Sequence, residues 1–337
     1  MRRTDICIAV CTRNRPERLS EALQSLAGLT TSDQFRYHVL VINNGSTETT
    51  SQVILDAESN YPQLNLRSVT EPCVGFAHAR NRATQETDAP WIAFFDDDQI
   101  ADPNWLTELW HAAQRNNTTC VGGSVRLRFI DPTFQPGPYC RQMLGETQPE
   151  ATEQQCGSEF NPGTGNLLIK RSVILDVGGF TTDHIGRGED SILIAKLRTK
   201  NYAVWFTPNA LIHHVISPER NHPAAYWTLA KEASCAGYFG WIRWGWRLPF
   251  VGIARLLFSI LLDLPKLCWL WLFGTMAQRV DQACAFRFDF NRSIADLQFG
   301  LRKYFQRPTT ANKNYRESPR SDERSYRHQT VERSTGD

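Results

Sequence analysis

The N-terminal third of the chain alternates short apolar runs with longer segments of helical periodicity, and this alternation constrains the fold most. The runs that predict strands are rich in β-branched residues and span residues 6–12, 37–44, 64–70 and 91–98. The segments between them that predict helices span residues 17–26, 49–58 and 75–86. Such an order is typical of βα units built around a mainly parallel sheet, so we predict an α/β fold.

Polar clusters follow three of these apolar runs. They occupy residues 12–15, 43–46 and 96–98, which lie at the carboxyl ends of the first, second and fourth predicted strands. Ligands of open α/β sheets bind beyond the carboxyl ends of the strands. We therefore expect the three clusters to converge on one polar crevice.

The rest of the chain has a more mixed order. Predicted strands at 121–129, 167–170, 204–207 and 210–213 are joined by a long loop at 131–165 and by predicted helices at 189–200 and 223–240. Long loops of this kind often form lids or binding loops. The expected organisation is a catalytic domain at 1–225, a helical C-terminal region at 226–305 and a disordered polar tail at 306–337.

Residues 247–277 are unusually apolar. Arg255, Asp263 and Lys266 interrupt the stretch, and a bilayer-spanning helix needs roughly 20 predominantly apolar residues. Two short helices lying in a membrane interface, or a re-entrant hairpin, are one interpretation. A pair of helices packed on the catalytic domain is the other, and the sequence leaves both open.

The overall charge and the cysteines exclude some classes of protein. The 37 basic and 35 acidic residues give a net charge of +2, so no global field steers the chain to nucleic acid. The nine cysteines are scattered without zinc-binding spacing, as expected for buried thiols in a reducing cytosol. We expect a cytoplasmic protein that is peripheral on the inner face of the cell membrane.

Asp96, Asp97 and Asp98 directly follow a buried apolar run. Adjacent carboxylates raise one another's pKa, and a divalent cation removes that conflict. Carboxylate oxygens suit Mg²⁺ or Mn²⁺, which also bind the diphosphate oxygens of substrates. A solvated acidic turn, or a cap for a helix beginning near Pro103, is the alternative.

These motifs, in this order, resemble glycosyltransferase family 2, whose GT-A fold has a Rossmann-like mixed sheet flanked by helices. The resemblance implies that Thr12, Arg13 and Arg15 lie beside the nucleotide base. It implies that Asn43 and Asn44 contact base and ribose, with Asn43 replacing the usual aspartate. An amide still bonds a uracil imide or a hydroxyl, but it brings no charge.

The other family motifs imply the remaining site residues. Asp96 and Asp98 match the metal-binding Asp-x-Asp, with Asp97 at the substrate, and Arg80 in the segment 75–81 faces phosphates or the metal carboxylates. On the acceptor side, Gly178-Gly179-Phe180 precedes Glu189-Asp190. Asp190 is the candidate base, and Glu189 holds the acceptor or exchanges roles with it. The same pair at a helix start is also a favourable dipole arrangement that needs no catalysis.

A histidine completes the metal shell in the resemblance. His213 is the first candidate and His214 the second, and a Pro-Glu-Arg stretch follows at 218–220. Gly165 and Asn166, where the long loop meets the next strand, are assigned to substrate binding.

The implied activity is inverting, metal-dependent transfer of a sugar from a nucleotide sugar to an acceptor hydroxyl, in bacterial-type cell-surface glycan or glycolipid synthesis. A UDP-sugar is the favoured donor, with GDP- and dTDP-sugars as alternatives, and the acceptor is a glycan or a lipid-linked molecule.

Three other functions are alternatives to glycosyl transfer. A nucleotidyltransferase would carry a Gly-rich phosphate loop after the first strand, and none follows 6–11. A processive synthase would have Gln at position 240 before Arg243-Trp244, where this chain has glycine. A non-catalytic sugar-nucleotide-binding or scaffold protein remains the alternative from another class.

Overall fold

The computed structural model describes residues 4–31, 34–47, 49–148, 151–157, 160–182, 188–234 and 247–305. The predicted tail at 306–337 lies outside the described residues, as does the pair Arg243-Trp244.

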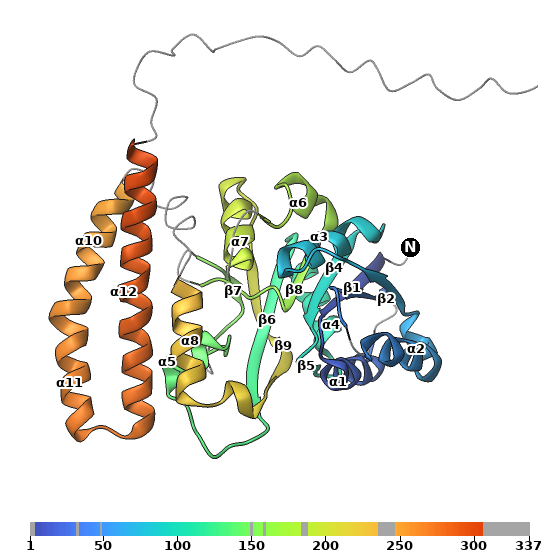
Figure 1. Cartoon of the computed structure of the whole chain (residues 1–337). Helices are drawn as coiled ribbons and strands as arrows, with labels where there is room; N and C mark the ends of the chain where they lie inside the picture. Colours follow the sequence, from blue (N-terminus) through green and yellow to red (C-terminus); the bar gives the residue numbers. More distant parts are fainter. Residues whose placement is uncertain are drawn as a thin grey trace, which may run out of the picture.

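The N-terminal half is the predicted parallel βα arrangement (Figure 1). Its strands are β1 Thr4–Thr12, β2 Phe35–Asn43, β3 Arg67–Thr70 and β4 Trp91–Asp96. Its helices are α1 Pro16–Ala27, α2 Thr50–Asn60 and α3 Phe76–Glu86, with a 3₁₀ turn η1 at Pro62–Leu64. The strands lie in the order β3-β2-β1-β4 and all pair in parallel.

The second half adds strands of both directions to the same sheet, which continues as β4-β8-β6-β9-β5; β6 and β9 pair in parallel, and the other pairs are antiparallel. These strands are β5 Gln99–Ala101, β6 Cys120–Phe129, β7 Gln154–Gln155, β8 Asn166–Lys170 and β9 Trp205–Ile216. The helices are α4 Trp105–Arg115, α5 Pro138–Met143, α6 Arg171–Asp176 and α7 Glu189–Thr199. The mixed sheet flanked by helices confirms the predicted fold class.

One prediction in this half was wrong. The two short strands expected at 204–207 and 210–213 form the single strand β9, which pairs with β6 along its length. The register shifts so that Gly123 lies opposite Thr207 and Ser124 opposite Leu211. The three intervening residues Pro208, Asn209 and Ala210 are therefore accommodated as a bulge, and the strand continues past them.

The core occupies both faces of the sheet. Ile6, Ile8 and Val10 of β1 pack with α1, α2 and α4 on one face, and Cys7 and Ala9 pack with α3, α6 and α7 on the other. Residues of a strand alternate between faces, and parallel strands covered on both faces read as continuous apolar runs. Burial raises the pKa of Cys7 to about 12, so this thiol is an inert packing group.

The C-terminal region is helical, as expected, but differs from the predicted pair of short helices. Helix α8 spans Pro223–Ser234, and α12 spans Met276–Phe305. Between them, α10 Leu248–Phe258, a π-helical turn Ser259–Asp263 and α11 Leu264–Phe273 form one helical stretch of 26 residues. Pro265 lies in the first turn of α11, and the π-helical turn immediately before it lets the chain continue helically without a break.

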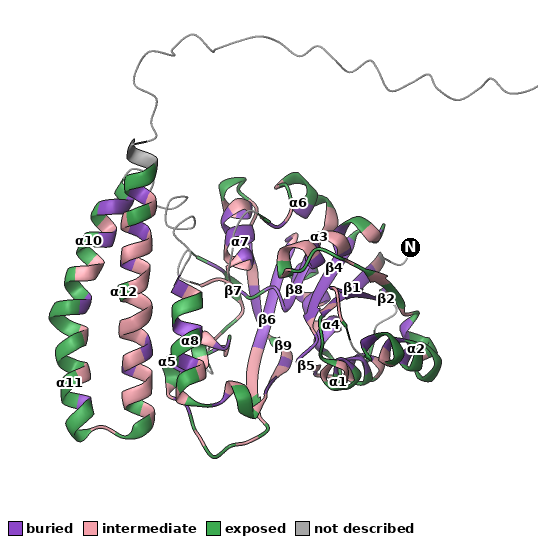
Figure 2. Cartoon of the chain, viewed as in Figure 1, coloured by how far each residue is buried: buried purple, intermediate pink, exposed green. Residues whose placement is uncertain are grey.

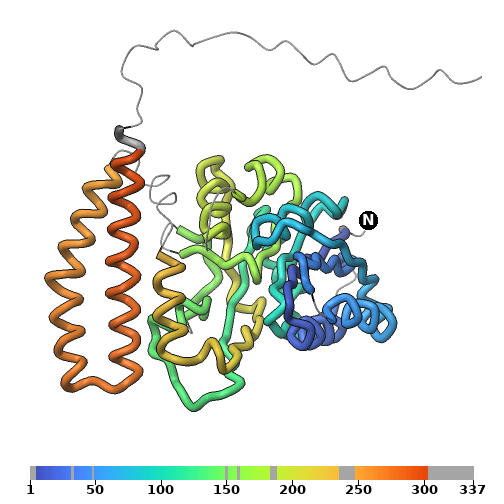
Figure 3. Tube along the Cα trace, viewed as in Figure 1, coloured from blue at the N-terminus to red at the C-terminus, as the bar shows by residue number. Residues whose placement is uncertain are grey.

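Helix α12 lies between this apolar stretch and the catalytic domain (Figures 1 and 3). It contacts α10 and α11 on one side and α5 and α8 on the other. The stretch Leu248–Phe273 is long and apolar enough to cross a membrane by length and composition. Most of its outward surface is exposed (Figure 2).

Candidate active site

The carboxyl ends of β1, β2 and β4 bring the three predicted polar clusters together. Thr12 pairs with Asn43, and Cys11 pairs with Asp96 in the strand register. The loop after β1 is tied to the loop after β2, since the amide of Asn14 donates to Ser46 Oγ (3.1 Å) and the amide of Thr47 donates to Asn14 Oδ1 (2.9 Å).

The two loop asparagines after β2 have different surroundings. Asn44 is buried and donates from Nδ2 to the carbonyls of Glu71 (3.0 Å) and Cys73 (2.7 Å), while its Oδ1 accepts from the Gly75 amide (2.8 Å). Asn44 thus fixes the loop before α3. Asn43 uses Oδ1 to accept from the Ser46 amide (3.1 Å), a local turn bond at the rim of the crevice.

Arg15 joins two carboxylates of the acidic cluster. Its Nη1 donates to Asp97 Oδ1 and to Asp98 Oδ2, both at 3.0 Å. Asp97 is nine-tenths buried or more, and burial raises the pKa of its carboxyl to about 6 although the Arg15 charge opposes the rise. Thr12 is buried beside this cluster, whereas Arg13 is exposed.

Asp98 accepts from cationic groups that come from distant parts of the chain. Arg220, in the 3₁₀ turn η2 at Pro218–Arg220, donates from Nη1 to Asp98 Oδ2 at 2.7 Å, and His214 Nε2 lies 3.4 Å from the same oxygen. Burial alone would raise the pKa of the Asp98 carboxyl. His214, Arg220 and Arg15 outweigh burial and hold this pKa well below its usual range.

The structure places His214, rather than the preferred candidate His213, at the acidic cluster. Successive side chains of a strand point to opposite faces, so only one of the two can reach Asp98. His214 also lines the cavity described below, and its Nδ1 donates to the Leu144 carbonyl at 2.9 Å. Because Nδ1 is used for this bond, Nε2 is the ring atom that faces Asp98 and that would bind a metal ion after losing its proton. Arg220 was not among the predicted site residues, although its Pro-Glu-Arg stretch was visible in the sequence.

Arg80 bridges the two halves of the site. Its Nη2 donates to Asp96 Oδ1 at 3.2 Å, and its Nη1 donates to Glu189 Oε1 at the start of α7. Burial would lower the pKa of this guanidinium, but the charges of Asp96 and Glu189 outweigh burial and raise the pKa. The side chain also lies against the rings of Phe76 and Phe180, at 5.6 Å and 5.8 Å from their centroids.

The neighbour of Arg80 holds the acceptor-side loop. Asn81 Nδ2 donates to the Phe180 carbonyl and Asn81 Oδ1 accepts from the Phe180 amide, both at 2.8 Å. Gly178 and Gly179 precede this contact with φ of +76° and +66°, a conformation that side chains rarely adopt. The segment with Arg80 and the Gly-Gly-Phe motif therefore form one unit.

Asp190 follows Glu189 in the first turn of α7 and lines the same cavity as Asp96. Its Oδ1 accepts from the Ser191 amide at 2.6 Å. Burial, followed by the charge of Glu189, raises the pKa of the Asp190 carboxyl. A raised pKa makes the carboxylate a better proton acceptor, which suits the predicted role of base.

Gly165 and Asn166 have structural roles at the rim of the site. A Cβ on Gly165 would lie 2.2 Å from Asp96 Oδ2, so only glycine allows this carboxylate its position. Asn166 is buried, and its Nδ2 donates to the carbonyls of Ser124 (2.9 Å) and Ala210 (3.0 Å). Its Oδ1 accepts from Trp105 Nε1 at 2.7 Å. The Asn166 amide thus fastens β6, β9 and α4 together.

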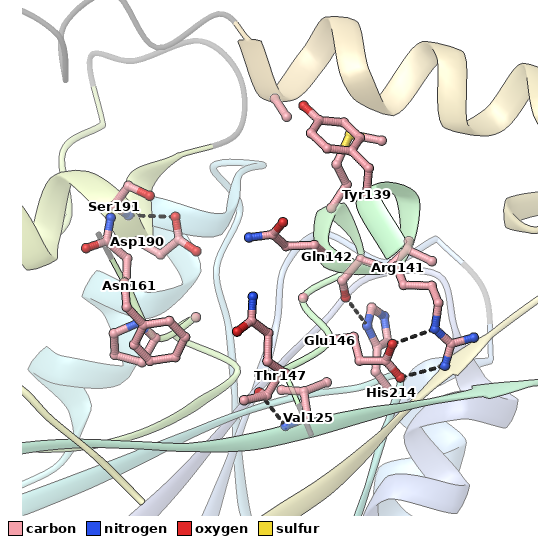
Figure 4. A pocket seen from close by; sticks show the side chains of 18 of the residues that line it. Val125, Tyr139, Arg141, Gln142, Glu146, Thr147, Asn161, Asp190, Ser191 and His214 are labelled. Carbon is pink, nitrogen blue, oxygen red and sulfur yellow. Dashed lines mark hydrogen bonds and ion pairs between the residues drawn. The ribbon is translucent and has the colours of Figure 1, made fainter. Parts of the chain in front are cut away.

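A large cavity of about 1660 Å³ opens at these residues. Figure 4 shows Asp190 and Ser191 on one side, and Tyr139, Arg141 and His214 on the other. Pockets for one small ligand usually enclose about 300–1,000 Å³. The cavity is therefore large enough for two substrates.

Asp98 and His214 are the two side chains whose spacing can be compared with that of metal ligands. Among the residues that the structure describes, no three His, Cys, Asp or Glu side chains form a complete metal cluster. Mg²⁺ commonly takes one or two protein ligands plus phosphate oxygens, and adjacent octahedral ligands at 2.1 Å lie about 3 Å apart. The 3.4 Å between Asp98 Oδ2 and His214 Nε2 suits such a pair, and Arg220 Nη1 contacts both atoms at 2.7 Å and 3.3 Å.

Comparison with known proteins gives a family match. The family model described as Glycosyl transferase family 2 matches residues 7–178. The succinoglycan biosynthesis protein ExoM of Rhizobium meliloti is 27% identical over 69% of this chain and 72% of its own length. The O-antigen biosynthesis protein RfbC of Myxococcus xanthus is 25% identical over 70% of this chain but only 19% of its own length.

Solved structures share the fold. The mannosyltransferase PcManGT of Pyrobaculum calidifontis, in complex with GDP-Man and Mn²⁺, is 19% identical with a TM-score of 0.56, and the match covers 91% of this chain and 88% of that protein. TarS of S. aureus is 17% identical with a TM-score of 0.51 over 87% of this chain and 55% of TarS.

Proposed function

The chain belongs to glycosyltransferase family 2 and is a glycosyltransferase, and we propose that it transfers a sugar from a nucleoside-diphosphate sugar to an acceptor hydroxyl with inversion at the anomeric carbon. The observation that carries the proposal is the position of Arg80, which joins Asp96 at the end of β4 to Glu189 beside Asp190. The buried guanidinium of Arg80 thus connects Asp96, on the predicted donor side, to Glu189, on the predicted acceptor side.

In the proposed reaction, Asp190 takes the proton of the acceptor hydroxyl while the hydroxyl oxygen attacks the anomeric carbon. The bond from that carbon to the diphosphate breaks, and the diphosphate leaves with the electron pair. Glu189 is already bound to Arg80, so Asp190 is the carboxylate with the freedom to accept a proton. Its raised pKa supports the same assignment.

The leaving diphosphate needs positive charge close by. Arg80 and Arg15 supply guanidinium groups at the two ends of the acidic cluster. Asp96, Asp98 and His214 are the residues that would hold Mn²⁺ or Mg²⁺, which supplies further stabilisation of the leaving charge. The Mn²⁺ in the solved structure of PcManGT supports a metal in this fold.

We further propose a UDP-sugar as donor and cell-surface polysaccharide synthesis as the context. A solved structure of TarS of S. aureus, with a TM-score of 0.50, holds UDP-GlcNAc, whereas PcManGT holds GDP-Man. Asn43 presents an amide at the base-binding rim, and an amide can bond a uracil imide. The names of the relatives from Rhizobium meliloti and Myxococcus xanthus support the context.

Release of the nucleoside diphosphate tests the proposal directly. Full-length protein with Mn²⁺ should release UDP slowly from a UDP-sugar, whereas a non-catalytic binding protein would release none. Asp190→Asn should bind UDP as tightly as wild type while losing acceptor-dependent turnover by at least about 10²-fold. Asp176→Asn, an exposed aspartate on α6, serves as the matched control. Full turnover in Asp190→Asn would show that another group is the base.

A further inference from the structure

Leu248–Phe273 and α12 form a helical hairpin with an ion-pair network between its two helices. Arg255 pairs with the fully buried Asp296 of α12, and Arg292 Nε donates to the same carboxylate at 3.2 Å. Gly252 allows close packing here, since a Cβ would lie 2.9 Å from the Ser293 carbonyl. Arg255, one of the charges that interrupt the apolar sequence, is therefore neutralised against α12.

The outer face of the same helical stretch is an apolar stripe. The exposed side chains of this stretch, called the apolar stripe here, are Phe250, Ile253, Leu257, Phe258, Ile260, Leu261, Leu262, Leu264, Trp269, Trp271, Leu272 and Phe273. Exposed apolar patches of this extent mark protein or membrane contacts. Helix α12 carries many charges and packs on the catalytic domain, so the hairpin suits the membrane surface better than a bilayer crossing.

The inner side of the hairpin forms a wall of the catalytic cavity. Lys266 and Leu270 of α11 and Gln282 of α12 line the same cavity as Asp96 and Asp190. The hairpin is fastened to the opposite wall, because Asp281 of α12 accepts from the amides of Tyr139 (3.0 Å) and Cys140 (2.8 Å) at the start of α5.

Lys266 lies where the cavity meets the apolar stripe. It is exposed, it lines the cavity, and it has no ion-pair partner among the residues that the structure describes. A lysine at the edge of an apolar membrane-facing surface reaches the level of lipid phosphates.

We propose that the acceptor is lipid-linked: its tail stays in the bilayer beside the apolar stripe, its phosphate link lies at Lys266, and its glycan end reaches Asp190 through the cavity. This inference rests on the proposed function, because it names the acceptor class of that site. A bilayer fits the stripe better than a protein partner does, because the stripe includes the exposed Trp269 and Trp271, and tryptophans favour the membrane interface.

Vesicle flotation of full-length protein tests the inference, with phosphatidylcholine vesicles and with the same vesicles containing a long-chain isoprenyl phosphate. Wild type should bind both, and the isoprenyl phosphate should raise binding about 5-fold. Lys266→Gln should keep basal binding and lose that increase, whereas Lys200→Gln, a surface lysine paired with Asp176, should keep it. Free inorganic phosphate should not displace the protein.

The apolar stripe is tested by Leu261→Glu combined with Leu272→Glu. This variant should lose binding to both kinds of vesicle, while Leu175→Glu, on α6, should bind as wild type does. The double variant of the stripe should still release UDP from a UDP-sugar, and a wild-type protein that releases no UDP would refute the proposed function instead. The inference is overturned if isoprenyl phosphate adds nothing, if inorganic phosphate competes, or if the stripe variant only converts a dimer to a monomer.

Discussion

Arg220 contacts both atoms that would hold a divalent cation, Asp98 Oδ2 and His214 Nε2, so we expect its removal to tighten metal binding. Its Nη1 lies 2.7 Å from Asp98 Oδ2 and 3.3 Å from His214 Nε2. A hydrogen bond to a charged group contributes about 1.5–3 kcal/mol, and an incoming ion must displace it. Arg220→Gln should therefore lower the Kd for Mn²⁺ by roughly 10- to 150-fold.

Electron paramagnetic resonance of free Mn²⁺, titrated with full-length protein and UDP, measures this Kd without relying on turnover. Asp98 keeps Arg15 as a partner at 3.0 Å in the variant, so the carboxylate is not left without a cation. Arg220→Lys should restore weak binding because it restores the charge, and Arg36→Gln, at an exposed pair with Asp5, should change nothing. Equal or weaker Mn²⁺ binding in Arg220→Gln would refute the competition and show that Arg220 supports the ligand.

Three further perturbations follow from the site. In the folded protein the pKa of Asp97 is about 6, above its usual value of 3.8, so the folded state binds the proton more tightly than the unfolded chain does. The free energy of unfolding should therefore fall as pH rises from about 4 to about 6. Asp97→Asn should remove this pH dependence and raise the free energy of unfolding by about 1–3 kcal/mol above pH 6. Urea unfolding at a series of pH values measures both effects. Gly165→Ala should displace the Asp96 carboxylate and lower turnover at least about tenfold, with a melting temperature measured alongside. Asn81→Ala should cost about 1–3 kcal/mol in thermal unfolding, because it removes both bonds to Phe180; an unchanged melting temperature would contradict this.

The parallel half of the sheet was predictable because β1, β4 and most of β2 are buried on both faces. Burial on two faces requires continuous β-branched runs such as residues 6–12 and 37–44, and these leave a clear signal in the sequence. In the second half of the sheet the sequence pattern predicted the strands less clearly. Pro208 and Asn209 looked like a break between strands, and only pairing with β6 showed that a bulge absorbs them.

The C-terminal region shows the same limit. Composition identified 247–277 as apolar, but it could not show which way Arg255 and Asp263 point. The structure pairs Arg255 with Asp296, and Asp263 accepts from Gln282 at 3.5 Å, so both charges face α12. A local pattern cannot reveal partners that lie 19 to 41 residues away.

The choice between His213 and His214 depended on strand parity, which a pair of adjacent histidines leaves undetermined. The bulge in β9 fixes that parity, and it sends His214 toward Asp98. Arg220 lies 122 residues from Asp98, so no spacing rule linked the two.

The adjacent carboxylates Asp97 and Asp98 have different partners, and their pKa values shift in opposite directions. Both are buried, yet the pKa of Asp97 rises to about 6 while that of Asp98 falls below its usual range. The difference follows from partners, because Asp97 shares Arg15 whereas Asp98 also has Arg220 and His214. Asp98 therefore keeps its negative charge to lower pH than Asp97 does. A fixed charge is what a cation at the diphosphate requires, and this supports Asp98 over Asp97 as the metal ligand.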